Sequence, residues 1–222
     1  MVRAGQGRPE MTDDILLRED HGAVARLTLN APQSLNALSE AMIDRLQAEL
    51  DLLRTQEGTR AVVIRGAGRA FCPGHDLKEM QRGRQAPDGG AGYYNALFAK
   101  CARMMTSVTR LPQPVIAEVH GVAAAAGCQL VATCDMAVAA SDARFGVNGV
   151  NIGLFCSTPM VALTRNVPAK RAFEMLTTGR LIDAEEAEAI GLINRAVAPG
   201  TQGDAAMEMA EAVASKLKAA VT

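Results

Sequence analysis

The stretch HGVAAAAGCQLVATCD, residues 120–135, sets four alanines between two glycines and then leads into one uncharged polar residue, Gln129. Apolar residues lie on both sides of that glutamine. Two interpretations fit this pattern. The segment is either a buried helix that packs through small side chains, or a run of small residues that leaves space for a ligand beside Gln129. The rest of the chain has to decide between them.

The overall composition is typical of a globular protein. Of the 222 residues, 49% are hydrophobic and 21% are charged, and the formal net charge is −1. A chain this close to neutrality has no general attraction for nucleic acids or anionic membranes, and with 3% aromatic residues and no tryptophan it offers few surfaces for base stacking. No apolar run approaches the roughly 20 residues of a membrane span. We therefore expect neither nucleic acid nor membrane as a partner.

Cysteine and histidine usage indicates neither a disulfide framework nor a metal site. The five cysteines, at positions 72, 101, 128, 134 and 156, form no CxxC pair. The three histidines, at positions 21, 75 and 120, are far apart in the sequence. This pattern suits a reducing compartment. Residues 1–13 are expected to form a disordered lead, and the start has no apolar stretch of a signal peptide. The sequence therefore predicts a cytoplasmic protein.

Hydrophobic periodicity predicts strands that alternate with helices, and hence an α/β fold without a linker or repeat. Strands are expected at 21–30, 60–66, 114–121 and 135–141. Residues 71–80 read as a loop that enters a helical turn. Helices are expected at 40–57, 93–110, 157–166, 169–178, 184–190 and 203–219. Ser39 is the predicted N-cap of the helix at 40–57, and Asp183 with Glu186 forms a capping-box pattern.

Several common catalytic motifs are missing. The segment AVVIRGAGRAF, residues 61–71, follows a strand but has Phe71 where a dinucleotide fingerprint needs its third glycine. The sequence contains no phosphate loop of the GxxxxGK[ST] type, no GxSxG nucleophile elbow and no HExxH zinc motif. Two loops rich in small residues remain as the candidate site.

Taken together, the ordered blocks of this chain resemble the enoyl-CoA hydratase/isomerase family, also called the crotonase superfamily, from about residue 14 to 197. The blocks are LNAL (35–38), FCPGHDL (71–77), PVIAEVHG (114–121), GCQLVATCD (127–135), ARF (143–145), RAFEMLTTG (171–179) and DAEEAEAIGLINRAV (183–197). The resemblance implies a crotonase-type ββα spiral with outer and C-terminal helices. It implies a core at 14–200, a C-terminal helix at 201–222 as a shortened trimerisation region, and a homotrimer or hexamer.

The resemblance also implies the ligand and the site. The family holds an acyl-CoA thioester, as in fatty acid metabolism, and two backbone N–H groups stabilise charge on the thioester oxygen. Those donors match His75 and Ala126. The matching positions that would contact substrate are Gly74, Asp76, Leu77, Gly127, Asn148 and Cys156. The ligand is the coenzyme A thioester itself; no covalently bound cofactor and no metal are implied.

Two positions depart from the family pattern. Hydratases of the family use two glutamates, and these match Gln129 and Gly149, neither of which can exchange a proton at neutral pH. We therefore expect a lyase or isomerase type of enzyme with doubtful hydratase activity. Three alternatives stay open: a non-catalytic CoA-binding or regulatory protein, a member of the protease branch with a Ser–His pair, or a true hydratase with a substitute base. Candidates for that base are His75, Asn148, Cys156, Glu118 and Asp135.

Overall fold

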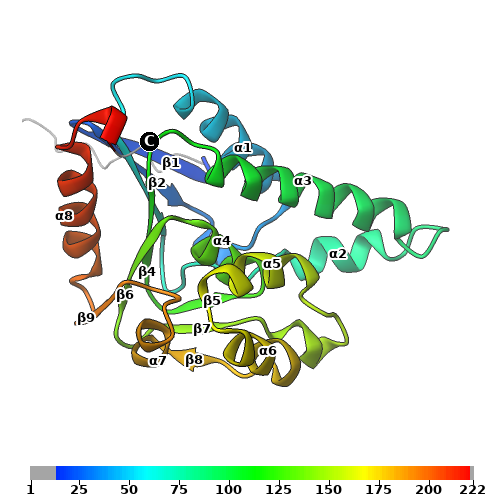
Figure 1. Ribbon diagram of the computed structural model, residues 1–222. Coiled ribbons are helices and arrows are strands. Elements are labelled where there is room, and N and C mark those ends of the chain that lie inside the picture. Colours follow the sequence, from blue (N-terminus) through cyan, green and yellow to red (C-terminus); the bar gives the residue numbers. More distant parts are fainter. Residues whose placement is uncertain (1–13, 221–222) are drawn as a thin grey trace, which may run out of the picture.

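The structure, a computed structural model that describes residues 14–220, is a mixed α/β fold built on two sheets (Figure 1). The larger sheet has the strand order β1-β2-β3-β4-β6-β9. Its strands are β1 Leu16–His21, β2 Val24–Leu29, β3 Ala61–Gly66, β4 Val115–Val119, β6 Met136–Ala140 and β9 Arg195–Val197. The expected lead at 1–13 lies outside the described residues.

Strand pairing follows the composition of each strand. β1 and β2 form an antiparallel hairpin through Gly22, which has φ +60°, and all later pairs in this sheet are parallel. The central strand β3 is apolar and buried along most of its length, as strands covered on both faces are. Strand β1 was not predicted, because its sequence LLREDH is charged and exposed toward its end, which is typical of an edge strand.

A smaller sheet and the helices complete the fold. The sheet has the order β5-β7-β8, with β5 Val122–Ala124, β7 Arg144–Gly146 and β8 Ile182–Asp183. The α-helices are α1 Glu40–Leu53, α2 Leu77–Gly83, α3 Ala91–Thr109, α4 Ala126–Thr133, α5 Ser157–Asn166, α6 Ala169–Thr178, α7 Ala184–Ala189 and α8 Gln202–Ala214. Short 3₁₀ turns are η1 Pro32–Ser34, η2 Asn148–Ile152 and η3 Lys218–Ala220.

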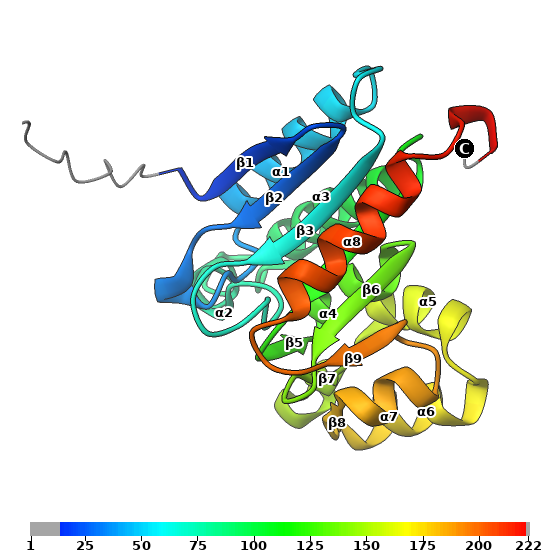
Figure 2. The ribbon, with the colours of Figure 1, turned by 90° about the vertical axis from the view of Figure 1, so that its left-hand side faces the viewer.

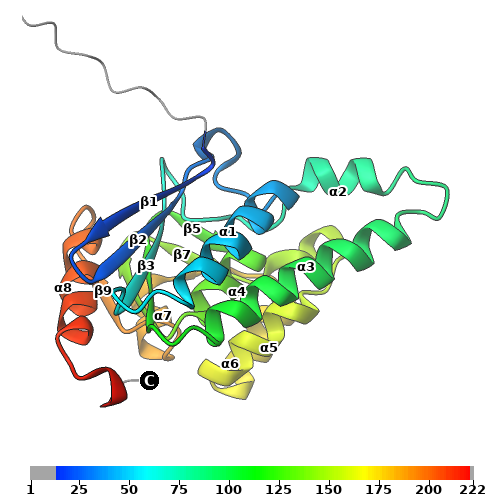
Figure 3. The ribbon, with the colours of Figure 1, turned by 90° about the horizontal axis from the view of Figure 1, so that it is seen from above.

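The large sheet lies between two layers of helices. Helices α1, α3 and α4 lie on one side of the sheet and α8 lies on the other, as the two rotated views show (Figures 2 and 3). The main core joins the first layer to the sheet through buried residues such as Leu27, Leu46 and Ile64. A smaller cluster under α8 contains Val63 and Ile116 together with Ala206 and Ala210. Helix α4 is therefore enclosed by the main core.

Local capping residues set the start of several helices. The Ser39 hydroxyl accepts a hydrogen bond from the Met42 N–H at 3.2 Å, and the Asp183 carboxylate accepts one from the Glu186 N–H at 2.8 Å, as predicted. Two helices are shorter than expected, because α1 ends at Leu53 and α8 at Ala214. The expected turn after residue 76 is a seven-residue helix, α2, whose N-cap is Asp76.

Two further observations bear on the expectations about partners and compartment. Within residues 14–220, no helix is both long and apolar enough to cross a membrane. All five cysteines are buried free thiols.

One buried carboxylate lies on the α8 side of the sheet. Glu118 in β4 is 1% exposed and its Oε1 lies 3.7 Å from the Nε of Arg65, while its Oε2 has no hydrogen-bond partner among the described residues. Burial raises the pKa of Glu118, and nearby Arg65 only partly opposes this. Because the folded-state pKa is raised, the stability associated with this group is present at acid pH and is lost as pH rises through that pKa.

We expect Glu118→Gln to increase the free energy of unfolding at pH 7 relative to the unmodified protein, because the neutral amide avoids the cost of burying a charge. The gain should shrink toward pH 4, where Glu118 itself becomes protonated. Urea unfolding at several pH values between 4 and 8 measures the difference. If the difference in unfolding free energy between Glu118→Gln and the unmodified protein does not change with pH, Glu118 does not titrate as its burial implies.

Candidate functional site

The alanine-rich stretch forms the turn from β5 into α4, and its small residues let another segment approach very closely. The Cys72 N–H donates to the Val122 oxygen at 3.0 Å, and the Ala124 N–H donates to the Cys72 oxygen at 2.9 Å. A Cβ added at Gly127 would lie 2.0 Å from that same Cys72 oxygen. The glycine at 127 is therefore required by packing. Ala123, Ala124 and Ala126 are buried in this contact.

The backbone N–H of His75 points away from Leu38, the residue with which His75 forms an isolated parallel β-bridge. The Leu38 N–H donates to the Gly74 oxygen at 2.8 Å, and the Asp76 N–H donates to the Leu38 oxygen at 3.4 Å. In an extended strand successive N–H groups point to opposite sides, so the His75 N–H points away from Leu38. Among the described residues it donates no hydrogen bond.

The Ala126 N–H is the second amide at this site that has no acceptor among the described residues. Ala126 is the first residue of α4, where backbone N–H groups have no acceptor within the helix, and no other described residue accepts its hydrogen bond. The positive end of the helix dipole adds to the field at this point. A Cβ added at Gly74 would lie 3.3 Å from the Ala126 nitrogen, so the loop carrying His75 adjoins the start of α4. The structure thus brings both predicted donor segments together.

Backbone strain marks the same turn. Ala125 has φ 47° and ψ −118°, a conformation that residues with a side chain rarely adopt. Its N–H donates to the Gly146 oxygen at 2.8 Å, and the Gln129 N–H donates to the Ala125 oxygen at 3.0 Å, so bonds on both sides hold it in place. Strained residues held in this way cluster at functional sites.

We expect Ala125→Gly to raise the free energy of unfolding by about 1 kcal/mol. Glycine adopts this conformation without strain, and that gain exceeds the added entropy of the unfolded chain. Chemical denaturation measures the change, and Ala212→Gly in the exposed part of α8 is the control, which should be destabilised. A loss of stability in Ala125→Gly comparable to that of the control would show that the turn is not strained.

The imidazole of His75 is held in the neutral form. Its Nδ1 lies 3.3 Å from the Leu38 oxygen, and the ring meets Phe98 edge to face with the ring centroids 5.7 Å apart. Burial lowers the pKa of His75, which the hydrogen bond to Leu38 only partly offsets. At neutral pH, Nδ1–H therefore donates to Leu38 and Nε2 keeps a free lone pair.

Gln129 lies one turn beyond Ala126 on the same helix. It is 6% exposed, and its Oε1 is buried without a hydrogen-bond partner among residues 14–220. Buried amides are normally hydrogen-bonded, so an unpartnered one calls for a ligand or water. The interpretation of residues 120–135 as packing alone accounts for the alanines but leaves this amide unexplained.

Gly149 has no room for a side chain. It lies in η2, and a Cβ added there would be 2.3 Å from the Leu154 oxygen and 2.8 Å from the sulfur of Cys156. Asn148 is the half-buried first residue of the same turn. Burial raises the pKa of the Cys156 thiol, so at neutral pH it is protonated and a poor base.

The remaining predicted site residues have local structural roles. The Asp76 carboxylate caps α2 by accepting from the N–H groups of Lys78 and Glu79 at 2.8 and 3.2 Å, and Leu77 is exposed. Asp135 accepts from the Val115 N–H at 2.8 Å, which ties β4 to β6. Glu118 lies on the opposite face of the sheet, beneath α8, so the structure does not bring it to the site.

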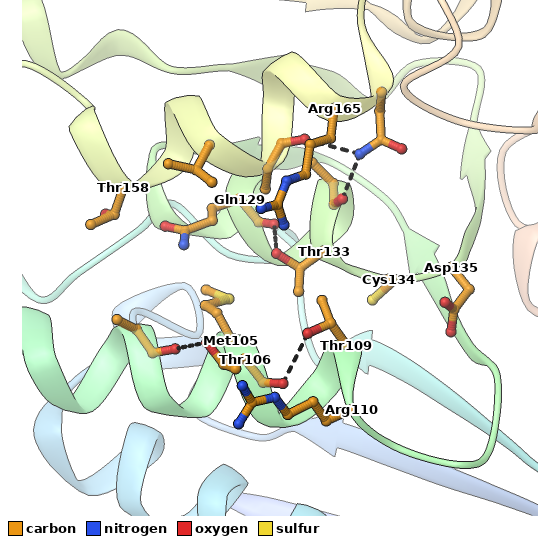
Figure 4. A pocket seen from close by; sticks show the side chains of 15 residues that line it. Met105, Thr106, Thr109, Arg110, Gln129, Thr133, Cys134, Asp135, Thr158 and Arg165 are labelled. Carbon is orange, nitrogen blue, oxygen red and sulfur yellow. Dashed lines mark hydrogen bonds between the residues drawn. The ribbon is translucent and has the colours of Figure 1, made fainter.

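A pocket of about 680 Å³ opens beside Gln129, between α3, α4 and α5 (Figure 4). Thr133 of α4, Arg110 at the end of α3 and Arg165 of α5 also line it. Neither arginine was predicted as a site residue. Each lies at the C-terminal end of a helix, where a cation is common because it stabilises the helix dipole, so no sequence signal distinguishes them.

Comparison with known proteins identifies the relatives of this chain. The sequence model of the enoyl-CoA hydratase/isomerase family matches residues 19–222. A crystal structure of an enoyl-CoA hydratase from Mycobacterium smegmatis is 53% identical, with a TM-score of 0.89 over 94% of this chain and 80% of that one. The mitochondrial enoyl-CoA hydratase domain-containing protein 3 is 47% identical in Xenopus laevis over 82% of this chain, and 41% identical in Homo sapiens over 96%.

The chain spans 60% of the length of the Xenopus relative and 68% of the human one. Five vertebrate relatives of this type bear names that place them in mitochondria, and this contradicts the cytoplasmic expectation. The reason for the error is physical. Buried free cysteines indicate a reducing compartment but do not identify which one.

Proposed function

The chain belongs to the enoyl-CoA hydratase/isomerase family and has the crotonase-type α/β fold of its structural neighbours, and on that premise we propose that it binds an acyl-CoA thioester. The thioester oxygen is held by the N–H groups of His75 and Ala126, which stabilise the enolate-like charge that develops on it. The observation that carries the proposal is that these two amides, on adjoining segments, have no acceptor within residues 14–220. One such donor typically contributes about 3 kcal/mol in the transition state.

In the proposed site the reacting carbons lie next to Gln129 and Gly149, the positions that match the glutamates of hydratases. An amide does not transfer protons at neutral pH, so hydration lacks both its base and its acid, each worth about 100-fold or more. The neutral imidazole of His75 is the best-placed candidate base, since Cys156 is protonated and Glu118 is remote. The Asp135 carboxylate already accepts from the Val115 N–H, and the Asn148 amide does not take up protons at neutral pH. Enolate chemistry of the lyase or isomerase type therefore fits the site better than rapid hydration.

The test is a titration and an activity measurement with crotonyl-CoA. We expect binding by isothermal titration calorimetry, together with a very slow fall in the ultraviolet absorbance of the conjugated double bond. A broad panel of acyl-CoA thioesters then searches for turnover. Failure of every thioester to bind would contradict the proposal. Rapid hydration of crotonyl-CoA would instead show that another group replaces the glutamates.

The alternative function, a non-catalytic CoA-binding or regulatory protein, predicts binding without turnover of any thioester in the panel. The protease alternative has no support in residues 14–220, where no serine hydroxyl is hydrogen-bonded to a histidine. A serine-directed probe that fails to label the protein would remove it.

We also propose a homotrimer or a hexamer built from it, with the C-terminal region from residue 201 contributing. Large apolar side chains are exposed on η2 and the adjoining α6, with Ile152 at 63% and Phe173 at 67%. Phe155, which follows η2, is 48% exposed. Patches of this kind mark interaction surfaces. Sedimentation velocity distinguishes this proposal from a monomer, which would contradict it.

A further inference from the structure

The pocket between α3, α4 and α5 has a buried end and an open end. Gln129 is buried, whereas Arg110 and Arg165 are exposed at the mouth. Figure 4 shows these arginines on opposite sides of Thr133. The pocket volume of about 680 Å³ lies within the range of small-molecule sites.

Four of the polar side chains that line this pocket already donate their hydrogen bonds to helix carbonyls. The hydroxyls of Thr106, Thr109 and Thr133 donate to the oxygens of Ala102, Thr106 and Gln129 at 2.7, 2.9 and 2.7 Å respectively. The Asn166 amide donates to the Ala132 and Ala162 oxygens at 2.8 and 2.9 Å. These groups are not available as donors to a ligand.

Four polar side chains of the lining remain available as donors, and two of them are charged. Arg110 and Arg165 make no side-chain hydrogen bond and no ion pair with the described residues. The Gln129 amide and the Thr158 hydroxyl make no hydrogen bond with them either. The carboxylate among the lining residues, Asp135, already accepts from the Val115 N–H. The charged side chains of the lining are therefore two guanidinium groups and one carboxylate, which gives the open end of the pocket a net positive charge. Guanidinium groups bind carboxylates through paired hydrogen bonds.

We propose that this pocket accepts an acyl group that ends in a carboxylate, so that the thioester is the monothioester of a dicarboxylic acid. Arg110 and Arg165 bind the far carboxylate, and the Gln129 amide contacts the acyl chain near the thioester. The inference rests on the proposed function, because the Ala126 N–H that would hold the thioester lies one turn before Gln129 on α4.

The helix sets the length of the acyl group. Thr133, which lies between the arginines, is four residues beyond Gln129 and hence about 6 Å further along α4. An extended chain advances roughly 1.2 Å per bond, so the four C–C bonds of a five-carbon diacid and the C–O bond of its far carboxylate together span about 6 Å. Glutaryl-CoA is therefore the probe, and hexanoyl-CoA is its uncharged counterpart.

The experiment compares these two thioesters by isothermal titration calorimetry. The variants are Arg110→Gln, Arg165→Gln and their combination, with Arg103→Gln as the matched control, an exposed arginine of α3 outside the pocket lining. We expect the unmodified protein to bind glutaryl-CoA at least tenfold more tightly than hexanoyl-CoA. In each pocket variant the affinity for glutaryl-CoA should fall by about tenfold, and the affinity for hexanoyl-CoA should change little. The control variant should keep its affinity for both thioesters. Added salt should weaken the binding of glutaryl-CoA more than that of hexanoyl-CoA.

Equal affinity of the two thioesters in the unmodified protein would overturn this inference and leave the proposed function intact. A loss in Arg103→Gln equal to that in the pocket variants would overturn it as well. If neither thioester binds, the proposed function fails, and free glutarate then tests the arginines alone. Glutarate binding that requires both arginines supports the carboxylate site, and no glutarate binding overturns it.

Discussion

Gly127→Ala is expected to destabilise the protein by about 3 kcal/mol and to abolish acyl-CoA binding. The added methyl group would lie 2.0 Å from the Cys72 oxygen and 2.9 Å from the Cys72 Cβ. Both segments are anchored by backbone hydrogen bonds between Cys72 and β5, so neither can move without breaking pairs. Overpacking of a tightly packed contact commonly costs 1 to roughly 3 kcal/mol, and the collision here is with backbone atoms.

The measurement for Gly127→Ala is urea unfolding, followed by titration with crotonyl-CoA. Gly58→Ala is the matched control, because no atom of residues 14–220 lies within 4 Å of its added Cβ and its backbone is not in the left-handed region. We expect that control to behave like the unmodified protein. If Gly127→Ala keeps its full stability and binding, the close approach of the two loops does not form the site.

Gln129→Glu is expected to raise the rate of crotonyl-CoA hydration by about 100-fold, starting from a very slow rate. The substitution returns a carboxylate to the position one turn beyond Ala126, where it can take part in proton transfer. Burial raises the pKa of a carboxyl group, so the rate should increase with pH as the introduced group ionises. The absorbance of the conjugated double bond follows the reaction, and Gln129→Leu is the control of similar size, which should show no gain.

Equal hydration rates in the unmodified protein and in Gln129→Glu, with binding preserved, would show that Gln129 does not face the reacting carbons. The second hydratase position offers no equivalent test. A side chain at Gly149 would collide with the Leu154 oxygen at 2.3 Å, so a glutamate there requires the turn to change shape. Recovery of a full hydratase from this chain therefore needs more than two substitutions.

Sequence reasoning predicted those features that depend on neighbouring residues. The Ser39 cap, the Asp183 cap and the apolar strands β3, β4 and β6 follow from local patterns, and the structure confirms them. The ordered blocks were enough to indicate the family, because they retain the small residues that allow the loop at 71–77 to meet the turn at 124–127. The edge strand β1 was missed, since a strand with one exposed face and many charges has no clear periodicity.

The sequence by itself therefore determined the alternation of elements, the family and the candidate donors, His75 and Ala126. Only the tertiary structure decided that their amides have no acceptor in the described part of the chain, that Gly149 is closed to any side chain, and that Arg110 and Arg165 line one pocket. The reason is the range of the interactions involved. Capping and periodicity act over a few residues, whereas these properties depend on contacts between segments that lie far apart in the chain and meet only when the fold closes.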